Sequence, residues 1–401
     1  MPTGTAVHER TMALCESLSY REWAGYYAVS SYEVHFHHEY NAIRNASALL
    51  DISPLYKYRV SGRDALRLVD RVVTRDMRKV AVGQLVYAPW CDERGKVIDD
   101  GTILRLAEDV YRWTAADPNL RWIRDASTGL DVTVEDVSSE VAALALQGPT
   151  SARLLADLAG EDLLALRYFR GRAATVAGVP VEITRNGYTG DLGYEIWIPW
   201  ARAGEVWDAI VLTGRAHGLR PAGMLALDVA RIEAGLLLLE VDYTSVLRAL
   251  IDDQTSSPFE LGWDRLVHLD KPEPCIGRDA LREEARRGGP ARRLVGLQID
   301  WTDVERLYAR FGLTPSMPAA ASRAAVPVYS GDRQVGKATS TTWSPTLKKM
   351  IALATVESRR AAPGTRLALE LTIEANRLKA GAEVVPLPFF NPPRKTAIPA
   401  A

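Results

Sequence analysis

The stretch GKVIDDGTILRL, residues 95–106, places Asp99 and Asp100 side by side in an otherwise apolar segment that glycines interrupt. Side chains alternate between the two faces of a strand, so the two acids should point in opposite directions. One carboxylate can lie in solvent, and the other then faces the interior or a cavity. A carboxylate in that position is costly unless something pairs with it. The stretch therefore predicts a strand with one inward-facing acid that needs a partner.

The bulk composition indicates an ordinary globular protein of several domains. Its 401 residues exceed the size at which a single hydrophobic core stops growing, so two or three domains are expected. Lys and Arg total 49 against 50 Asp and Glu, a balance that argues against a nucleic-acid binder. The longest Leu-rich run, GLLLLEV, is too short to span a bilayer, so no membrane partner is expected. The three scattered cysteines and the lack of a signal-peptide pattern predict a cytoplasmic protein.

Helical and strand patterns alternate along the first two-thirds of the chain. Residues 64–77 and 151–169 have apolar positions at helical spacing, whereas residues 138–148 and 174–187 have the pattern of strands. The fold class expected from this mixture is α+β.

From Arg292 onward, short strands separated by Gly, Pro and Asp turns predict an antiparallel β barrel or sandwich. The segment WTDVERLYARFGLTPSMP (301–318) should begin with a short helix capped by Thr302 or Asp303.

The histidine-rich segment HFHHEY, residues 35–40, has some features of a metal site. A zinc site needs three or four converging ligands, and no second motif supplies the missing ones. We therefore expect no metal.

A second acid of interest lies in RNGYTGDLGYEIWIP, residues 185–199. The glycines predict a tight turn, after which Glu195 shares a strand face with Trp197. Taken alone, Glu195 is either a solvated strand acid or an inward ligand for a cationic or amidine-like group, and the solvated interpretation is favoured because Glu is rarely buried unpaired.

The segment ALDVARIEAGLLLLEVDY, residues 226–243, carries an apolar stripe at helical spacing. Arg231 and Glu233 fall at the edge of that stripe or away from it. The simplest interpretation is an exposed charge pair on an amphipathic helix.

Taken together, these segments resemble the aminomethyltransferase family, which comprises the T-protein of the glycine cleavage system and its folate-dependent relatives. The blocks that carry the resemblance occur in the family's order: GKVIDDGTI, LQGPTSARLL, NGYTGDLGYEI, ARIEAGL, LGWDRLVHLDKPEPCIGRDAL and GKATSTTWSPTLKKMIALATV. The early block EYNAIRNASALLDISPLYKYRVSG also resembles the opening of that family. The match runs from about Tyr20 to about Pro388.

The resemblance implies a ring of three subdomains around a central cavity that holds tetrahydrofolate. Residues 1–50 and 138–240 would form the first α/β subdomain, and residues 51–137 and 241–288 the second. Residues 289–401 would form the C-terminal β barrel.

The resemblance also implies roles for individual residues. Glu195 would bind the exocyclic amine and ring NH of the pterin. Arg231, Tyr87 and Tyr188 would contribute to folate binding. Asp100 would lie near the reactive ring nitrogen, where its charge stabilises a cation, and Asp99 would face away.

Three departures from glycine-cleavage T-proteins resemble the folate-dependent demethylases instead. Ala116 and Asp117 stand about where T-proteins carry an Asn, LLLLEVDYTS replaces a PLYG-like turn, and residues 301–318 form an insertion. We therefore expect methyl transfer from a small O-, N- or S-methylated substrate to tetrahydrofolate.

For an ether substrate, the leaving oxygen needs a proton. By resemblance to the O-demethylases, Tyr243 is the candidate acid. Tyr26 and Tyr27 are candidates for the substrate pocket. For each of these tyrosines, core packing with a hydrogen-bonded hydroxyl is an equally good interpretation.

Two alternatives remain open at this point. One is aminomethyl transfer from a lipoylated carrier protein, the only case in which a protein partner is expected. The other is a non-catalytic folate-binding regulatory protein on the same fold.

Overall fold

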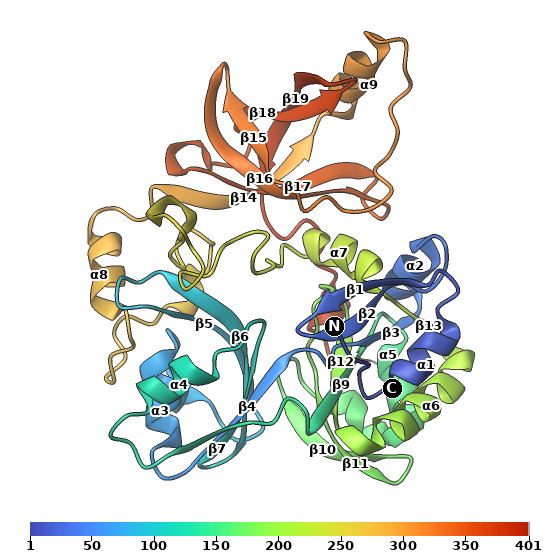
Figure 1. Cartoon of the computed structure of the whole chain (residues 1–401), viewed down its shortest axis with the longest axis vertical. Coiled ribbons are helices and arrows are strands. Elements are labelled where there is room, and N and C mark those ends of the chain that lie inside the picture. The colour runs from blue at the N-terminus through green and yellow to red at the C-terminus, as the bar shows by residue number, and fades with distance from the viewer. Residues whose placement is uncertain (400–401) are drawn as a thin grey trace.

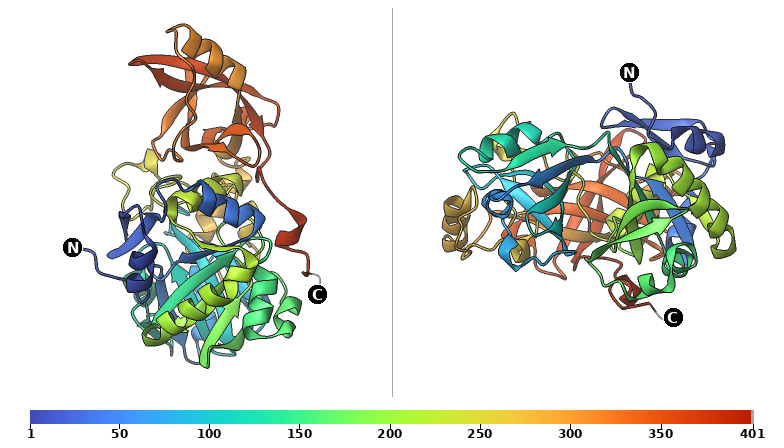
Figure 2. Two further views of the ribbon diagram at one scale, coloured as in Figure 1. Left: turned by 90° about the vertical axis from the view of Figure 1, so that its right-hand side faces the viewer. Right: turned by 90° about the horizontal axis from the view of Figure 1, so that it is seen from below.

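The computed structural model describes residues 1–399 and arranges them as three packed units (Figure 1). Two units that combine sheets and helices lie side by side, and a β barrel lies against one end of the pair (Figures 1 and 2). Each unit has its own buried apolar cluster. The expected α+β class with a terminal barrel is confirmed, whereas the exact residue limits of the subdomains stay a prediction.

The first unit is built on a six-stranded sheet in the order β10-β11-β12-β9-β3-β13. Its strands are β3 (Ser47–Asp51), β9 (Val141–Gln147), β10 (Gly171–Val176), β11 (Val179–Thr184), β12 (Gly193–Pro199) and β13 (Leu219–Pro221). The helices of this unit are α1 (His8–Leu14), α2 (His37–Asn45), α5 (Ser151–Ala159), α6 (Ala203–Gly214) and α7 (Met224–Glu233). A two-stranded ribbon of β1 (Ser19–Trp23) and β2 (Tyr26–Ser31) packs beside α7.

The second unit is built on a five-stranded antiparallel sheet in the order β5-β6-β7-β4-β8. Its strands are β4 (Tyr56–Ser61), β5 (Leu85–Cys91), β6 (Val97–Ala107), β7 (Val110–Ala115) and β8 (Thr133–Asp136). Its helices are α3 (Ala65–Val72), α4 (Leu120–Ala126) and α8 (Arg278–Arg286). The chain thus leaves the first sheet after β3, builds the whole second sheet, and returns at β9.

The third unit is a closed barrel in the order β14-β17-β16-β15-β18-β19. Its strands are β14 (Arg292–Ile299), β15 (Val326–Ser330), β16 (Arg333–Ser344), β17 (Lys349–Glu357), β18 (Arg366–Ile373) and β19 (Asn376–Val385). Helix α9 (Trp301–Ala309) begins where the sequence predicts, but Asp300 rather than Thr302 or Asp303 caps it. The Asp300 carboxylate accepts from the backbone amides of Thr302 and Asp303, so the cap lies two or three residues earlier than expected.

A buried lysine binds both of the chain segments that connect the first α/β unit to the second. Lys57 is fully buried, and its Nζ donates to the carbonyl oxygens of Ser53 at 2.7 Å, Leu55 at 2.6 Å and Ser138 at 3.4 Å. Ser53 and Leu55 lie between β3 and β4, and Ser138 lies between β8 and β9. Burial lowers the pKa of Lys57 to about 7, although Asp51 opposes this shift.

We expect Lys57 to make stability depend on pH above neutrality. Its folded pKa of about 7 lies below the unfolded value of about 10.4, so between these values the unfolded chain binds more protons and the free energy of unfolding rises with pH. Between pH 7 and pH 9 the wild type should gain about 2 kcal/mol more than Lys57→Met. Urea denaturation at both pH values measures this difference. Lys337→Met, at an exposed lysine, is the control, and an equal pH response in all three proteins would contradict the expectation.

Within residues 1–399, none of the helices combines the length and apolar character needed to cross a bilayer.

Candidate functional site

The candidate site lies where the two sheets face each other. Arg112 on β7 forms a partly buried ion pair of 2.5 Å with Glu182 on β11, and its guanidinium lies 3.9 Å from the ring centre of Trp197 on β12. These contacts join the inner faces of the two sheets. Residues that share those faces by strand alternation therefore point into the space between the units.

Asp100 is one of these inward-facing residues. It pairs with Pro89 across the β5–β6 ladder, and Tyr87 lies on the same face because it pairs with Thr102. A glycine must follow Asp100, since a Cβ at Gly101 would lie 1.9 Å from the Thr114 carbonyl oxygen of β7. The close approach of β6 and β7 thus fixes the strand directly beside the acid.

Two tyrosine hydroxyls hold the Asp100 carboxylate, one on each oxygen. The Tyr87 hydroxyl donates to Oδ2 at 2.7 Å, and the Tyr243 hydroxyl donates to Oδ1. The ring of Trp263 packs edge-on against both tyrosine rings, with centroid distances of 5.9 and 5.5 Å. This arrangement provides the partner that the sequence demanded for an inward-facing acid.

Burial sets the proton affinities in this cluster. It raises the pKa of Asp100, and the hydrogen bonds from Tyr243 and then Tyr87 oppose the rise. Burial first and the Asp100 charge second raise the pKa of both tyrosines well above 10, so both hydroxyls stay protonated at neutral pH. Asp100 and Tyr87 nevertheless keep some accessible surface.

Asp99 faces the opposite side of β6, as alternation requires, but it does not lie in solvent. It is 0% exposed, and Oδ2 accepts from the Asn119 side chain at 2.8 Å and from the Asp117 amide at 3.0 Å. Its Oδ1 accepts from the Asp100 amide. Burial and then the Asp100 charge raise the pKa of Asp99. Helix α4 and the segment before it cover this face, so the expectation of one solvated acid is wrong.

Glu195 on β12 is the second inward-facing acid. It is only 8% exposed, so the solvated interpretation is wrong. Within residues 1–399, no Lys, Arg or His forms an ion pair with it; Arg112 is committed to Glu182. Burial raises the pKa of Glu195, and the neighbouring Asn186 and then the Arg112 charge oppose the rise. A buried carboxylate without an ion-pair partner can accept hydrogen bonds from a ligand.

Tyr188 packs against an apolar cluster that includes residues of α7. Its hydroxyl donates to the Leu237 carbonyl. Burial is the main cause that raises the Tyr188 pKa; Arg231 opposes the rise, and Asp100 adds to it. The Arg231 and Asp100 charges both act on the Tyr188 hydroxyl, so the three residues lie in one neighbourhood, and a role of Tyr188 in folate binding stays a prediction.

Arg231 and Glu233 are both 0% exposed, so the expected surface charge pair is wrong. The Arg231 guanidinium donates to Asp242 at 2.5 Å and to the Ser340 hydroxyl at 2.8 Å. It therefore links α7 to the barrel and to the turn that carries Tyr243. This position differs from that of a residue lining the site, because no surface of Arg231 is left for direct contact with a ligand.

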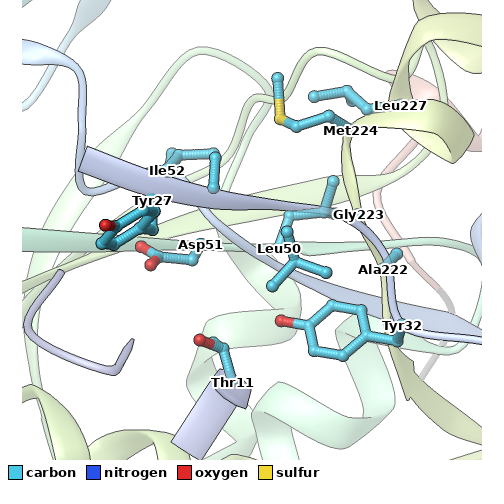
Figure 3. A pocket seen from close by; sticks show the side chains of 12 residues that line it. Thr11, Tyr27, Tyr32, Leu50, Asp51, Ile52, Ala222, Gly223, Met224 and Leu227 are labelled. Atoms are coloured by element: carbon cyan, nitrogen blue, oxygen red, sulfur yellow. The ribbon is translucent and has the colours of Figure 1, made fainter. Parts of the chain in front are cut away.

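The structure does not bring Tyr26 and Tyr27 to the Asp100 carboxylate. The Tyr26 ring packs 5.7 Å from Trp200, and the Tyr27 ring stacks 5.6 Å from His8. Tyr27 instead lines a small separate pocket with Thr11 and Asp51 (Figure 3).

Sequence reasoning missed Trp263 and Asp242. Trp263 lies within the block LGWDRLVHLD, and Asp242 directly precedes Tyr243, so both were visible in segments that mattered for the resemblance. Neither could be assigned a role, because their partners lie far away in the sequence. Within residues 1–399, no group of three or more His, Cys, Asp or Glu residues is arranged to hold a metal ion.

Comparisons with known proteins identify the family to which the chain belongs. The family model described as the GCVT N-terminal domain matches residues 5–271, and that of the glycine cleavage T-protein C-terminal barrel domain matches residues 309–391. Trimethylamine-oxide aldolase of Ruegeria pomeroyi is 37% identical over 366 residues, which cover 88% of this chain and 43% of that protein. Aminomethyltransferase of Bacillus pumilus is 33% identical over 358 residues, covering 88% of this chain and 90% of that protein.

A solved structure shares the fold. The crystal structure of glycine cleavage system aminomethyltransferase T from Bartonella henselae superposes with a TM-score of 0.80 at 23% identity, covering 98% of this chain and 99% of that one.

The fold and the matched domains define a one-carbon-transferring class of enzyme. The chain belongs to the aminomethyltransferase family, a family of tetrahydrofolate-dependent enzymes, and the resemblance seen in the sequence is confirmed. The chain spans less than half the length of the R. pomeroyi relative and about nine-tenths of the Bacillus relative.

Proposed function

We propose that this protein is a demethylase that transfers a methyl group from a small O-, N- or S-methylated substrate to tetrahydrofolate. The observation that carries the proposal is the Asp100 carboxylate held by Tyr87 and Tyr243, together with the ion-unpaired Glu195 on the facing sheet. The 37% identity to a protein named trimethylamine-oxide aldolase supports a methylated substrate.

Tetrahydrofolate fits the residues that face this space. The buried Glu195 carboxylate has free acceptor capacity that matches the N–H groups of a pterin. Tyr188 and Tyr87 would line the pterin ring. Arg231 would not touch the pterin but would position the site by holding α7 against the turn that carries Tyr243. When bound, tetrahydrofolate supplies the ring nitrogen that accepts the methyl group.

In the proposed reaction, Asp100 supplies a negative charge and Tyr243 supplies a proton. Asp100, which is partly buried, offers a negative charge beside the position where positive charge develops. Holding both reactants in that space contributes several kcal/mol, since a bimolecular encounter becomes a positioned one. With an ether donor, the carbon–oxygen bond breaks with its electron pair on oxygen. The Tyr243 hydroxyl, which stays protonated at neutral pH, can then give its proton to that oxygen.

We expect the Tyr243→Phe substitution to slow methyl transfer from some classes of donor and not from others. Loss of a general acid should slow turnover of methoxyaromatic donors about 100-fold. Sulfonium and quaternary ammonium donors release a neutral thioether or amine when they lose the methyl group, so the rates of methyl transfer from these donors should change little. Chromatographic detection of methyl-tetrahydrofolate across the three donor classes measures this, and it also tests the proposed function itself. An unaltered rate on an ether donor would dismiss Tyr243 as the acid.

Aminomethyl transfer from a lipoylated carrier is the second candidate function. The 33% identity to Bacillus aminomethyltransferases, spread over about nine-tenths of both chains, favours it. Incubation with glycine-loaded lipoylated carrier and tetrahydrofolate separates the two, because demethylation needs no carrier. Folate binding without turnover in either assay would indicate a regulatory protein.

A further inference from the structure

Asp228 on α7 lies at the centre of three arginines from three parts of the chain. Arg323, in the segment between α9 and β15, contacts both carboxylate oxygens at 2.9 and 2.7 Å. Arg21 on β1 donates to the same carboxylate at 3.3 Å, and the Arg231 Nε lies 3.7 Å from it. In Figure 1, α7 lies directly below the barrel, with β1 beside it.

The cluster has more positive than negative charge. Arg231 is already neutralised by Asp242, so Arg21 and Arg323 share the single charge of Asp228. Burial, and then repulsion from Arg323, lower the pKa of the Arg21 guanidinium. The Arg21 and Arg323 side chains are 24% and 34% exposed, whereas that of Asp228 is 5% exposed. The surplus charge therefore faces solvent above a buried carboxylate.

The cluster borders the candidate site. Ala321, two residues before Arg323, packs against the apolar cluster that contains Tyr243, and it also packs against a second cluster on which Tyr188 lies. Asp228 also contributes to the raised pKa of Tyr188. Asp228 lies 3.7 Å from Arg231, and Arg231 in turn binds Asp242, the residue next to Tyr243. The partly exposed Arg21 and Arg323 guanidinium groups therefore adjoin the cluster of Tyr243 and Asp100, at what we call its rim.

We propose that Arg21 and Arg323 form a carboxylate-binding site at this rim, with Asp228 holding the two guanidinium groups in place. Planar guanidinium groups bind carboxylates through paired, charge-assisted hydrogen bonds. Resting on the proposed function, two ligands could supply the carboxylate: the glutamyl tail of tetrahydrofolate, or a methyl donor that is itself a carboxylic acid.

The test measures binding by isothermal titration calorimetry, without turnover. The first arm compares tetrahydrofolate with tetrahydropteroate, which lacks the glutamate. The second arm titrates the folate-saturated protein with a methoxybenzoate and its carboxamide, and with N,N-dimethylglycine and its amide. Both arms use wild type, Arg21→Gln, Arg323→Gln and the charge-preserving Arg323→Lys. Arg310→Gln, at an exposed arginine outside the cluster, is the matched control.

If the folate tail is the ligand, wild type should bind tetrahydrofolate about tenfold more tightly than tetrahydropteroate. Both Gln variants should lose that preference, and Arg323→Lys should keep part of it. If the methyl donor is the ligand, wild type should bind each carboxylate donor more tightly than its amide, and both Gln variants should lose that preference. A carboxylate preference that is absent from both arms, or that survives both Gln variants, would overturn the proposal and leave Arg323 as an ion pair that joins the barrel to α7. Failure to form methyl-tetrahydrofolate would contradict the proposed function but would not alter this binding result.

Discussion

The Asp100→Asn variant should lose about 1000-fold in the rate of one-carbon transfer to tetrahydrofolate while its folate affinity changes only a few-fold. Asparagine retains the shape of the side chain, and its amide can still hydrogen-bond to both the Tyr87 and Tyr243 hydroxyls. What disappears is the negative charge beside the reacting nitrogen. Single-turnover rates, with folate binding measured separately, distinguish these two effects.

The pH profile gives this expectation a second readout. Burial raises the pKa of Asp100, so the wild-type rate should increase with pH as the carboxyl group ionises above its ordinary range. Asp100→Asn should lack that acid limb. Asp109→Asn, which removes an exposed acid beyond β6, should behave as wild type in both assays. Full activity of Asp100→Asn would remove this residue from the mechanism.

The Glu195→Ala variant should bind tetrahydrofolate more than about 100-fold less tightly, because the pterin N–H groups would lose a buried charged acceptor. The fold should tolerate the change, since Glu195 forms no ion pair within residues 1–399 and its raised pKa reflects a burial cost that the variant removes. Equilibrium titration by quenching of tryptophan fluorescence measures the affinity.

Glu135→Ala, at an exposed position on β8, is the matched control for charge and size. Thermal unfolding of the two variants verifies that any loss of affinity is not a loss of folded protein. An unchanged affinity in Glu195→Ala would refute the assignment of Glu195 to pterin binding. If turnover were lost while the affinity stayed unchanged, Glu195 would instead act in the reaction itself.

Local periodicity predicted those parts of the fold that depend on neighbours in the sequence. The alternation around Gly101 places Asp99 and Asp100 on opposite faces of β6, and the alternation after Gly193 places Glu195 with Trp197. The turn-separated strands after Arg292 predicted the terminal barrel or sandwich, and the structure closes them into a barrel. These features follow from backbone geometry that a few consecutive residues determine.

The same reasoning failed wherever burial decided the outcome. Arg231 and Glu233 have the spacing of a surface pair, yet the Tyr243 turn, the barrel and α2 cover them completely. Asp99 was expected in solvent, but Asn119 and α4 enclose it. Periodicity assigns a residue to a face, but it does not say what packs on that face.

What the sequence determined by itself is the direction in which each acid points, because strand and helix geometry act over a few residues. Only the tertiary structure decided which groups meet those acids. Tyr243 reaches Asp100 across 143 residues of chain, and Arg323 reaches Asp228 across 95. Such pairs depend on how three separately built units pack together, and that packing is set by the summed burial of many side chains rather than by any local pattern.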